Sequence, residues 1–350
     1  MNRVLLLLAV CVALVGARTH AGSRSAQHAA VLPEPRVVWI HAALFPADRA
    51  GAIGRMRALL DDYRAAGISA VFCFDSLPAQ HRKGWDFLAA LVAEAHARRI
   101  EVQPIICPGY PVALEGEVQR HPQWLITGMK GEIYRNLNLA HPGARQHVVD
   151  QVSEALRYDI DGIHLDYARF PVGQTFSYDR ETTDAFKKES GVSPLEAAHD
   201  SGSMIWCEWI KWNARQVTTL VGDIRNVVKG KDNRLVLSAA VFPSSGISPV
   251  EIGQDWADWS RRRLVDVLCP MLYTSDERLF REYVKDAVRV AKVGGCRLYA
   301  GIACASSHNK NTPAGVAAEM VIAREEGADG VVFFSGYSLD KSFLDVIKRD

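Results

Sequence analysis

The chain has 350 residues, of which 48% are hydrophobic, enough for the core of one large domain or of two ordinary ones. Its 41 lysines and arginines nearly balance its 40 aspartates and glutamates, so the composition predicts no electrostatic preference for nucleic acid. Beyond the N-terminal segment, no stretch is apolar and long enough to predict a membrane span.

The first residues are typical of an export signal. A positive charge at Arg3 precedes an apolar run over residues 4–15, and Ala17 or Ala21 offers a small-residue cleavage site. We therefore expect a signal peptide at residues 1–21, a flexible lead-in at 22–35, and export to the periplasm or the cell exterior. An uncleaved membrane anchor is the alternative.

From residue 36 onward, strand-like and helix-like segments alternate. Short apolar or β-branched runs predict strands at 37–42, 69–75, 101–107, 161–171, 234–242, 265–273, 297–303 and 330–335. Amphipathic runs predict helices at 47–66, 85–99, 143–158, 206–229, 253–263, 277–293, 312–326 and 339–348.

Eight strands, each followed by a helix, predict a closed (β/α)8 TIM barrel that forms a single domain over residues 36–350. A long loop follows the third strand, and the polar stretch 171–204 predicts an insertion after strand four. An open, doubly wound sheet is the competing architecture. The sequence lacks the Gly-x-Gly-x-x-Gly turn that would favour such a sheet with a dinucleotide cofactor, and we predict no cofactor.

The fourth strand lies in the run Asp-Gly-Ile-His-Leu-Asp-Tyr-Ala-Arg-Phe-Pro at residues 161–171. Side chains alternate along a strand, so His164 and Asp166 share the inward face and Tyr167 falls on the other. Asp166 would then face the carboxyl end of the barrel, where barrel enzymes carry their chemistry. Alternatively, Asp166 caps the next helix or pairs with Arg169.

Several runs resemble one bacterial family, glycoside-hydrolase-like family 10. The resemblance is carried by Leu-Asn-Leu-Ala-His-Pro-Gly-Ala-Arg at 137–145 and by residues 158–171. Further signatures are His-Pro-Gln-Trp at 121–124 and Gly-Gln-Asp-Trp at 253–256, followed by the run 264–274. The resemblance covers about residues 36 to 340. It implies a TIM barrel that acts on bacterial glycans, with denuded peptidoglycan strands or related amino-sugar polymers among the substrate classes.

Hydrolysis of a glycosidic bond usually needs two carboxyl groups, one to protonate the leaving oxygen and one as nucleophile or base. Asp166 is the first candidate, as the proton-transferring acid. Asp75 ends the second strand on the same face as Val71 and Cys73, which we expect to be the inward face, and Asp276 follows the sixth strand. Asp75 or Asp276 could instead cap the next helix, an alternative favoured for Asp276.

The pattern departs from related glycosidases. Family 10 enzymes and their clan place a glutamate after strand four and another near the end of strand seven, whereas residues 301–307 carry no acid here. In the chitinase-type pattern Asp-Gly-x-Asp-x-Asp-x-Glu, the catalytic glutamate would fall at Ala168. The sequence therefore predicts neither of those two mechanisms.

Sugars present apolar faces that stack on aromatic rings and polar edges that need hydrogen-bond partners. The side chains predicted to bind substrate are those near strand ends or in the long third loop: His164, Tyr167, Arg169, Trp124, Tyr273 and Tyr337. Arg169 could instead pair with an aspartate. Trp206, Trp209 and Trp212 have helical spacing, which favours packing over ligand contact.

A metal site is the other chemical option. His41 and His164, together with Asp75 and Asp166, would face inward by alternation. The sequence lacks a His-x-His after the first strand and any His-Glu-x-x-His, so we predict no metal.

Two functions follow from these residues. The first is an exported glycoside hydrolase that acts on a polysaccharide or oligosaccharide with Asp166 as its acid. The second is a catalytically silent glycan-binding barrel. A second inward carboxylate within about 10 Å of Asp166 would favour the hydrolase over the silent glycan-binding barrel.

Overall fold

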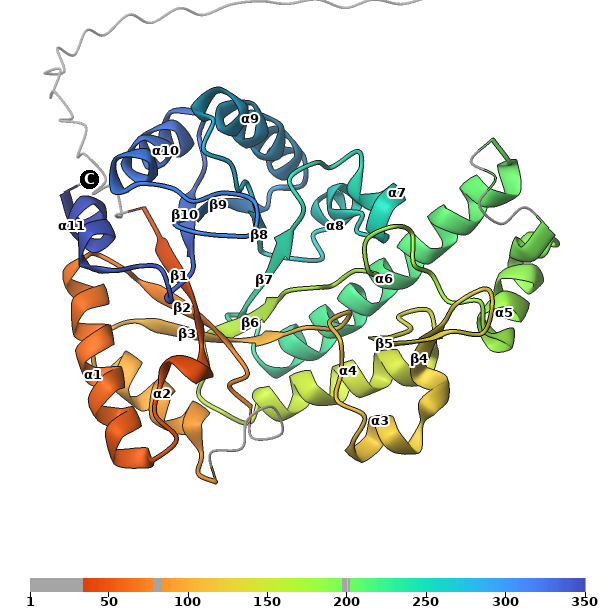
Figure 1. The fold of residues 1–350 in the computed structure, drawn as a ribbon, viewed down its shortest axis with the longest axis horizontal. Coiled ribbons are helices and arrows are strands. Elements are labelled where there is room, and N and C mark those ends of the chain that lie inside the picture. Colours follow the sequence, from red (N-terminus) through yellow and green to blue (C-terminus); the bar gives the residue numbers. More distant parts are fainter. Residues whose placement is uncertain (1–33, 78–83, 197–199, 201, 350) are drawn as a thin grey trace, which may run out of the picture. The chain divides into compact units, whose positions relative to one another are not determined.

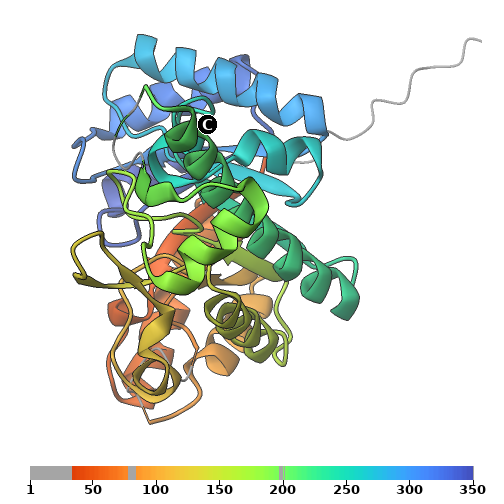
Figure 2. The same cartoon turned by 90° about the vertical axis from the view of Figure 1, so that its right-hand side faces the viewer.

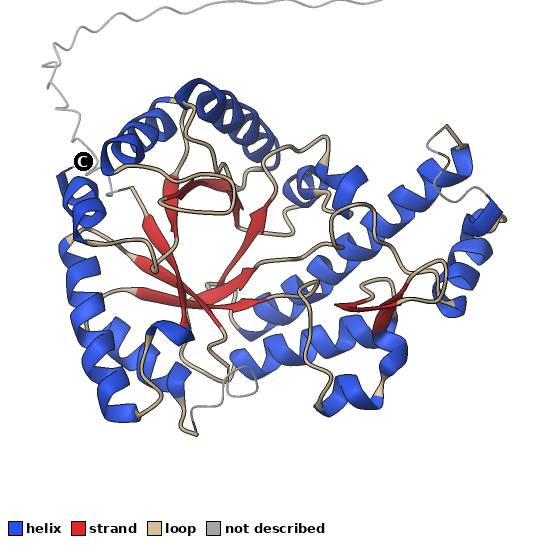
Figure 3. Cartoon of the chain, in the orientation of Figure 1, coloured by secondary structure: helices blue, strands red, loops and turns tan. Residues whose placement is uncertain are grey.

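The computed structural model describes residues 34–77, 84–196, 200 and 202–349. Within them, eight parallel strands close a barrel in the order β1-β10-β9-β8-β7-β6-β3-β2 (Figures 1 and 3). The barrel strands are β1 (Arg36–His41), β2 (Ala70–Phe74), β3 (Glu101–Ile106), β6 (Gly162–Leu165), β7 (Val236–Val241), β8 (Val267–Pro270), β9 (Arg297–Ala303) and β10 (Gly330–Phe334). The predicted (β/α)8 TIM barrel is confirmed.

Helices surround the barrel, as Figure 3 shows in blue. They are α1 (Arg49–Ala65), α2 (Phe87–His96), α4 (Pro142–Ala155), α6 (Met204–Lys231), α7 (Ser248–Ile252), α8 (Trp256–Arg261), α9 (Glu277–Gly294), α10 (Pro313–Glu325) and α11 (Lys341–Arg349). The helix predicted at 253–263 is the shorter α8, and α7, which was not predicted, precedes it. α7 ends where Gly253 adopts a left-handed conformation with φ of 68°, and Asp255 then caps α8.

Aspartates fasten the strands at the amino end of the barrel. Asp161, Asp266 and Asp329 each lie just before a strand, and each donates its backbone N–H to a carbonyl of the neighbouring strand. The carboxylate of the same aspartate accepts the N–H of that neighbour's residue, at 2.7 Å for Asp161 and Val102 and at 2.8 Å for Asp329 and Leu298. This paired bonding sets the register of adjacent strands because a one-residue slip would break both bonds.

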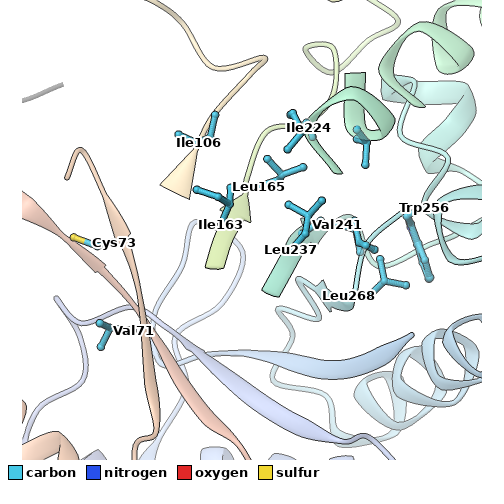
Figure 4. Packing of buried hydrophobic residues seen from close by; sticks show 14 of the residues in the cluster. Val71, Cys73, Ile106, Ile163, Leu165, Ile224, Leu237, Val241, Trp256 and Leu268 are labelled. Carbon is cyan, nitrogen blue, oxygen red and sulfur yellow. The ribbon is translucent and has the colours of Figure 1, made fainter. Parts of the chain in front are cut away.

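The buried side chains form two layers. Trp39, Phe72 and Tyr299 belong to the cluster inside the barrel, whereas Val71 and Cys73 belong to the cluster between the strands and the helices. Figure 4 shows part of this outer cluster on β2, β6 and β7. The prediction that Val71 and Cys73 mark the inward face of the second strand was therefore wrong by one residue.

Two parts of the chain extend the barrel on one side. The long loop after β3 contains α3 (Gly116–Arg120) and a hairpin of β4 (Leu125–Thr127) and β5 (Ile133–Leu137), which the sequence did not predict. The insertion after β6 carries α5 (Arg180–Ser190). The insertion bonds to the hairpin where Tyr178 donates its N–H to the Thr127 carbonyl, and Figure 2 turns this side toward the viewer.

The predicted signal peptide and residues 22–33 of the predicted lead-in lie outside the described residues. Among the described residues, no helix combines the length and apolar character needed to cross a membrane.

Candidate active site

Asp166 lies directly after β6, at the carboxyl end of the barrel. It is 6% exposed, its backbone N–H donates to the Ile106 carbonyl, and its Oδ1 accepts the N–H of Tyr167 at 2.7 Å. Burial raises the pKa of its carboxyl, while the Arg169 guanidinium and the Tyr167 N–H oppose that rise. The result is an acid held at the barrel mouth with its pKa shifted toward the range of a proton donor.

Arg169 lies beside this acid and is itself buried. Its Nη1 is 3.5 Å from Asp166 Oδ1, and its guanidinium lies 3.8 Å from the centroid of the Tyr167 ring and 4.8 Å from that of Phe242. Nη1 is buried without a hydrogen-bond partner among the described residues. A donor of this kind is suited to a substrate oxygen, because leaving it unpaired costs free energy.

The loop that carries Asp166 and Arg169 is held by close backbone contacts. Gly109 donates its N–H to the Tyr167 carbonyl at 2.8 Å, and a Cβ at Gly109 would lie 1.8 Å from the Arg169 carbonyl oxygen. The buried Gln254 amide reaches the Ala168 carbonyl at 3.4 Å and accepts the Phe242 N–H at 2.8 Å. Gly109 and the Gly-Gln-Asp-Trp signature at 253–256 therefore position the loop of the candidate acid.

Asp75 also lies at the barrel mouth. Its backbone is not extended, so the alternation of side chains along a strand does not predict its direction. Its φ of 49° turns the chain, and its carboxylate pairs with His41 Nε2 at 2.8 Å. His41 Nδ1 accepts the Ala43 N–H at 2.9 Å, so Nε2 must carry the proton donated to Asp75. The charges of Asp75 and Asp166 both contribute to the raised pKa of Cys107, after the larger effect of burial, so both carboxylates lie near that thiol.

Aromatic side chains line the same region. Tyr273 stacks on Phe334 with ring centroids 5.3 Å apart, and its pKa is raised by burial and then by the Asp166 charge. Tyr337 is 61% exposed, with its ring centroid 6.1 Å from that of His41. Tyr110 is 50% exposed and meets the Tyr167 ring edge-on at 4.8 Å.

Tyr110 was not among the predicted site residues, and His41 was considered only as a metal ligand. The loop position of Tyr110 after Pro-Gly at 108–109 was the available signal for its place at the mouth.

His164 lies below the site rather than in it. It is 0% exposed, and its Nε2 accepts the Trp39 indole N–H at 3.0 Å. Nδ1 must therefore carry the proton, which it donates to Ser238 Oγ at 2.8 Å, and Ser238 donates in turn to Gln103. The prediction that His164 contacts substrate is not supported, because both ring nitrogens are used inside the barrel.

Two other predicted residues have structural positions. Asp276 caps α9, where its carboxylate accepts the N–H groups of Arg278 and Leu279. This contact supports the capping alternative and not the predicted catalytic role. Trp124 stacks on His121 at 4.2 Å and lies 5.4 Å from His147 of α4. The structure gives Trp124 no contact with the residues around Asp166 among those it describes.

The barrel resembles solved glycosidase structures. The PgaB (BpsB) glycoside hydrolase domain from Bordetella bronchiseptica aligns with a TM-score of 0.73 at 16% identity, covering 91% of this chain and 100% of that domain. A β-galactosidase from the psychrophilic Marinomonas ef1 aligns with a TM-score of 0.64 at 15% identity, covering 86% of this chain and 54% of that one.

The catalytic domain of a β-amylase from Paenibacillus polymyxa aligns with a TM-score of 0.63 at 11% identity, covering 90% and 97% of the two chains. No curated protein matches the sequence significantly. Identities this low support the shared barrel fold and no more.

The sequence itself carries the family assignment. The model of the family Glycosyl hydrolase-like 10 matches residues 75–313, which include Asp75, Asp166 and the loops that hold them. The chain belongs to the family Glycosyl hydrolase-like 10.

Proposed function

We propose that this protein is an exported glycoside hydrolase that cleaves O-glycosidic bonds in an amino-sugar polysaccharide such as denuded peptidoglycan. The observation that carries the proposal is the arrangement of Asp166 and Arg169. A buried carboxyl with a raised pKa lies 3.5 Å from a buried guanidinium whose Nη1 has no hydrogen-bond partner among the described residues.

In this proposal Asp166 protonates the oxygen of the leaving sugar. General acids of glycosidases have a raised pKa, and burial moves the pKa of Asp166 in that direction. Nη1 of Arg169, which makes the 3.5 Å ion pair to Asp166, would bind a hydroxyl or acetyl oxygen of the sugar beside the scissile bond. The guanidinium also limits the rise in the pKa of Asp166, which keeps the acid able to release its proton.

Asp75 is the candidate for the second carboxylate. The N–H at Nε2 of His41 holds one of its oxygens at 2.8 Å, and its left-handed backbone marks a local strain of the kind found at functional sites. Asp75 would activate water or act as nucleophile, and His41 would position it. The exposed rings of Tyr110 and Tyr337 would stack on sugar faces next to the two acids.

The test is product analysis with purified protein and defined polymers: peptidoglycan without stem peptides, poly-N-acetylglucosamine in acetylated and partly deacetylated forms, and a neutral glucan. We expect shortened chains from an amino-sugar polymer, and loss of at least about 99% of the rate in Asp166→Asn. Asp276→Asn is the matched control, because asparagine caps a helix nearly as well as aspartate.

Equal turnover by wild type and Asp166→Asn would reject the proposed acid. Wild-type protein that binds these polymers but releases no product from any of them would instead favour a silent glycan-binding barrel.

A further inference from the structure

A pocket opens at the amino end of the barrel, at the end opposite the candidate active site. Its volume is about 400 Å³, and it is bounded by the first residues of β7 and β9, the approach to β8 and the last turns of α6. Five cationic side chains and one carboxylate line it: Arg225, Lys229, Arg234, Arg263, Arg297 and Asp266. This excess of positive charge is local, because the whole chain carries a net charge of only +1.

Two of the five cationic side chains have ion-pair partners that hold them in place. Lys229 Nζ lies 2.7 Å from Asp266 Oδ2 and donates to the Leu235 carbonyl at 2.6 Å, which ties the end of α6 to β7. Arg234 pairs with Asp232 at 2.7 Å. These contacts account for both side chains without a ligand.

The other three are guanidinium groups, each with at least one N–H that has no hydrogen-bond partner in the part of the chain that the structure describes. Arg225 Nη1 is buried without a hydrogen-bond partner among the described residues and has only a 3.5 Å ion pair to Asp266. Arg263 uses Nε to donate to the Gly294 carbonyl, and Arg297 uses Nη1 to donate to the Tyr299 hydroxyl. Three arginines, from α6, from the approach to β8 and from the start of β9, therefore line one pocket.

The single acid in the lining is already occupied. Asp266 meets Lys229 and Arg225 and also accepts the Leu237 N–H at 2.8 Å, as part of the strand-fastening bonds described above. Outside the lining, Glu101 lies within electrostatic range of Arg297, which lowers the pKa of Glu101 against the larger rise caused by burial. Among the described residues, Arg263 has no ion pair with an acid, and Arg225 has only the 3.5 Å pair to Asp266, which Lys229 shares.

We propose that this pocket binds a phosphate group, carried by a small phosphorylated molecule or by a phospholipid headgroup. The planar donor fork of arginine matches the oxygens of a phosphate, and a dianion can satisfy two guanidinium groups at once. The volume lies toward the lower end of the range of small-molecule pockets. A bound phosphate would also relieve the repulsion among the cations and pair the buried Nη1 of Arg225.

The pocket can be tested with the full-length protein, inorganic pyrophosphate as the probe and acetate at matched ionic strength as the reference. We expect saturable pyrophosphate binding by calorimetry and a raised melting temperature, because a ligand that binds only the folded state stabilises it. The double variant Arg225→Gln/Arg263→Gln should bind at least about tenfold more weakly. The control Arg261→Gln/Arg262→Gln removes two nearby arginines that are each 55% exposed and pair with Asp258, and it should bind as wild type does.

If the double variant does not fold, Arg263→Gln alone can be used, because it leaves the Arg225–Asp266 pair intact. We expect this variant to bind pyrophosphate about threefold more weakly than wild type. Vesicles of phosphatidylglycerol, compared with phosphatidylcholine, distinguish the two sources of phosphate. Sedimentation with the anionic vesicles that depends on Arg263 assigns a lipid headgroup, and pyrophosphate binding without it assigns a free phosphorylated molecule. No saturable pyrophosphate binding, or equal binding by wild type and Arg263→Gln, would overturn the proposal.

Discussion

The indole N–H of Trp39 donates to Nε2 of His164 over 3.0 Å inside the barrel, which fixes His164 as a neutral ring protonated at Nδ1. Phe72 stacks on the same ring with centroids 3.9 Å apart and an interplanar angle of 13°. These contacts join β1, β2 and β6 just below the candidate acid. His164 is therefore part of the packed layer of side chains inside the barrel beneath Asp166.

Acid should destabilise the protein through His164. Burial lowers the pKa of this ring to about 3, from 6.5 for an unperturbed histidine. The unfolded chain then binds more protons between these two values, so stability falls as pH drops below about 6.5, by at most about 1.4 kcal/mol per pH unit from this group. Urea unfolding at pH 7 and pH 5 measures the slope.

Two variants separate the effect of this charge from that of packing. His164→Gln should lose stability at pH 7 and show a shallower slope between pH 7 and 5. Trp39→Phe should cost about 1–3 kcal/mol by leaving Nε2 unpaired, while keeping the titrating ring. An unchanged slope in His164→Gln would contradict this account.

Glu319 should produce a pH dependence of the opposite sign. This residue of α10 is 2% exposed, its Oε1 accepts from Asn311 at 3.0 Å, and burial raises its pKa to about 8 from 4.5. The folded state then binds more protons at Glu319 than the unfolded chain does. The stability that this group contributes is therefore greatest below pH 4.5 and is lost as pH rises through about 8.

Glu319→Gln removes this titration. We expect the variant to have a higher melting temperature than wild type at pH 9 and a smaller difference at pH 5. The reverse order, with the larger gain at pH 5, would show that Glu319 is ionised in the fold.

Arg169 should control the pH at which the proposed hydrolase works. The guanidinium lowers the pKa of Asp166 against the larger effect of burial, so Arg169→Gln should raise that pKa further. A general acid is active while protonated, so the alkaline limb of kcat/KM should move upward by on the order of one pH unit. Arg180→Gln, at an arginine whose side chain is 94% exposed, should leave the limb in place.

The close approach of Gly109 to Arg169 should make the site sensitive to one methyl group. A Cβ at Gly109 would lie 1.8 Å from a backbone oxygen, so Gly109→Ala must shift the loop that carries Arg169. We expect hydrolysis to fall at least about tenfold, because small displacements of catalytic groups are costly. The control Gly54→Ala adds a methyl group to α1 with nothing within 4 Å and should stabilise the protein by up to about 1 kcal/mol.

Strand and helix order were readable from sequence because period-2 and period-3.6 patterns report local burial. The eightfold alternation sufficed for the barrel, and the run at residues 161–171 sufficed to place Asp166 after the fourth strand. The same local reasoning favoured the cap at Asp276, since an aspartate before an amphipathic run bonds to N–H groups within its own helix.

Tertiary structure decided which side chains meet. Alternation assumes an extended backbone, and it failed at Asp75 and Tyr167, where φ values of 49° and 53° turn the chain at the barrel mouth. The use of both His164 nitrogens depends on Trp39 and Ser238, which come from strands far apart in sequence. A single sequence does not encode such partners as a local pattern, because strands distant along the chain become neighbours only when the barrel closes.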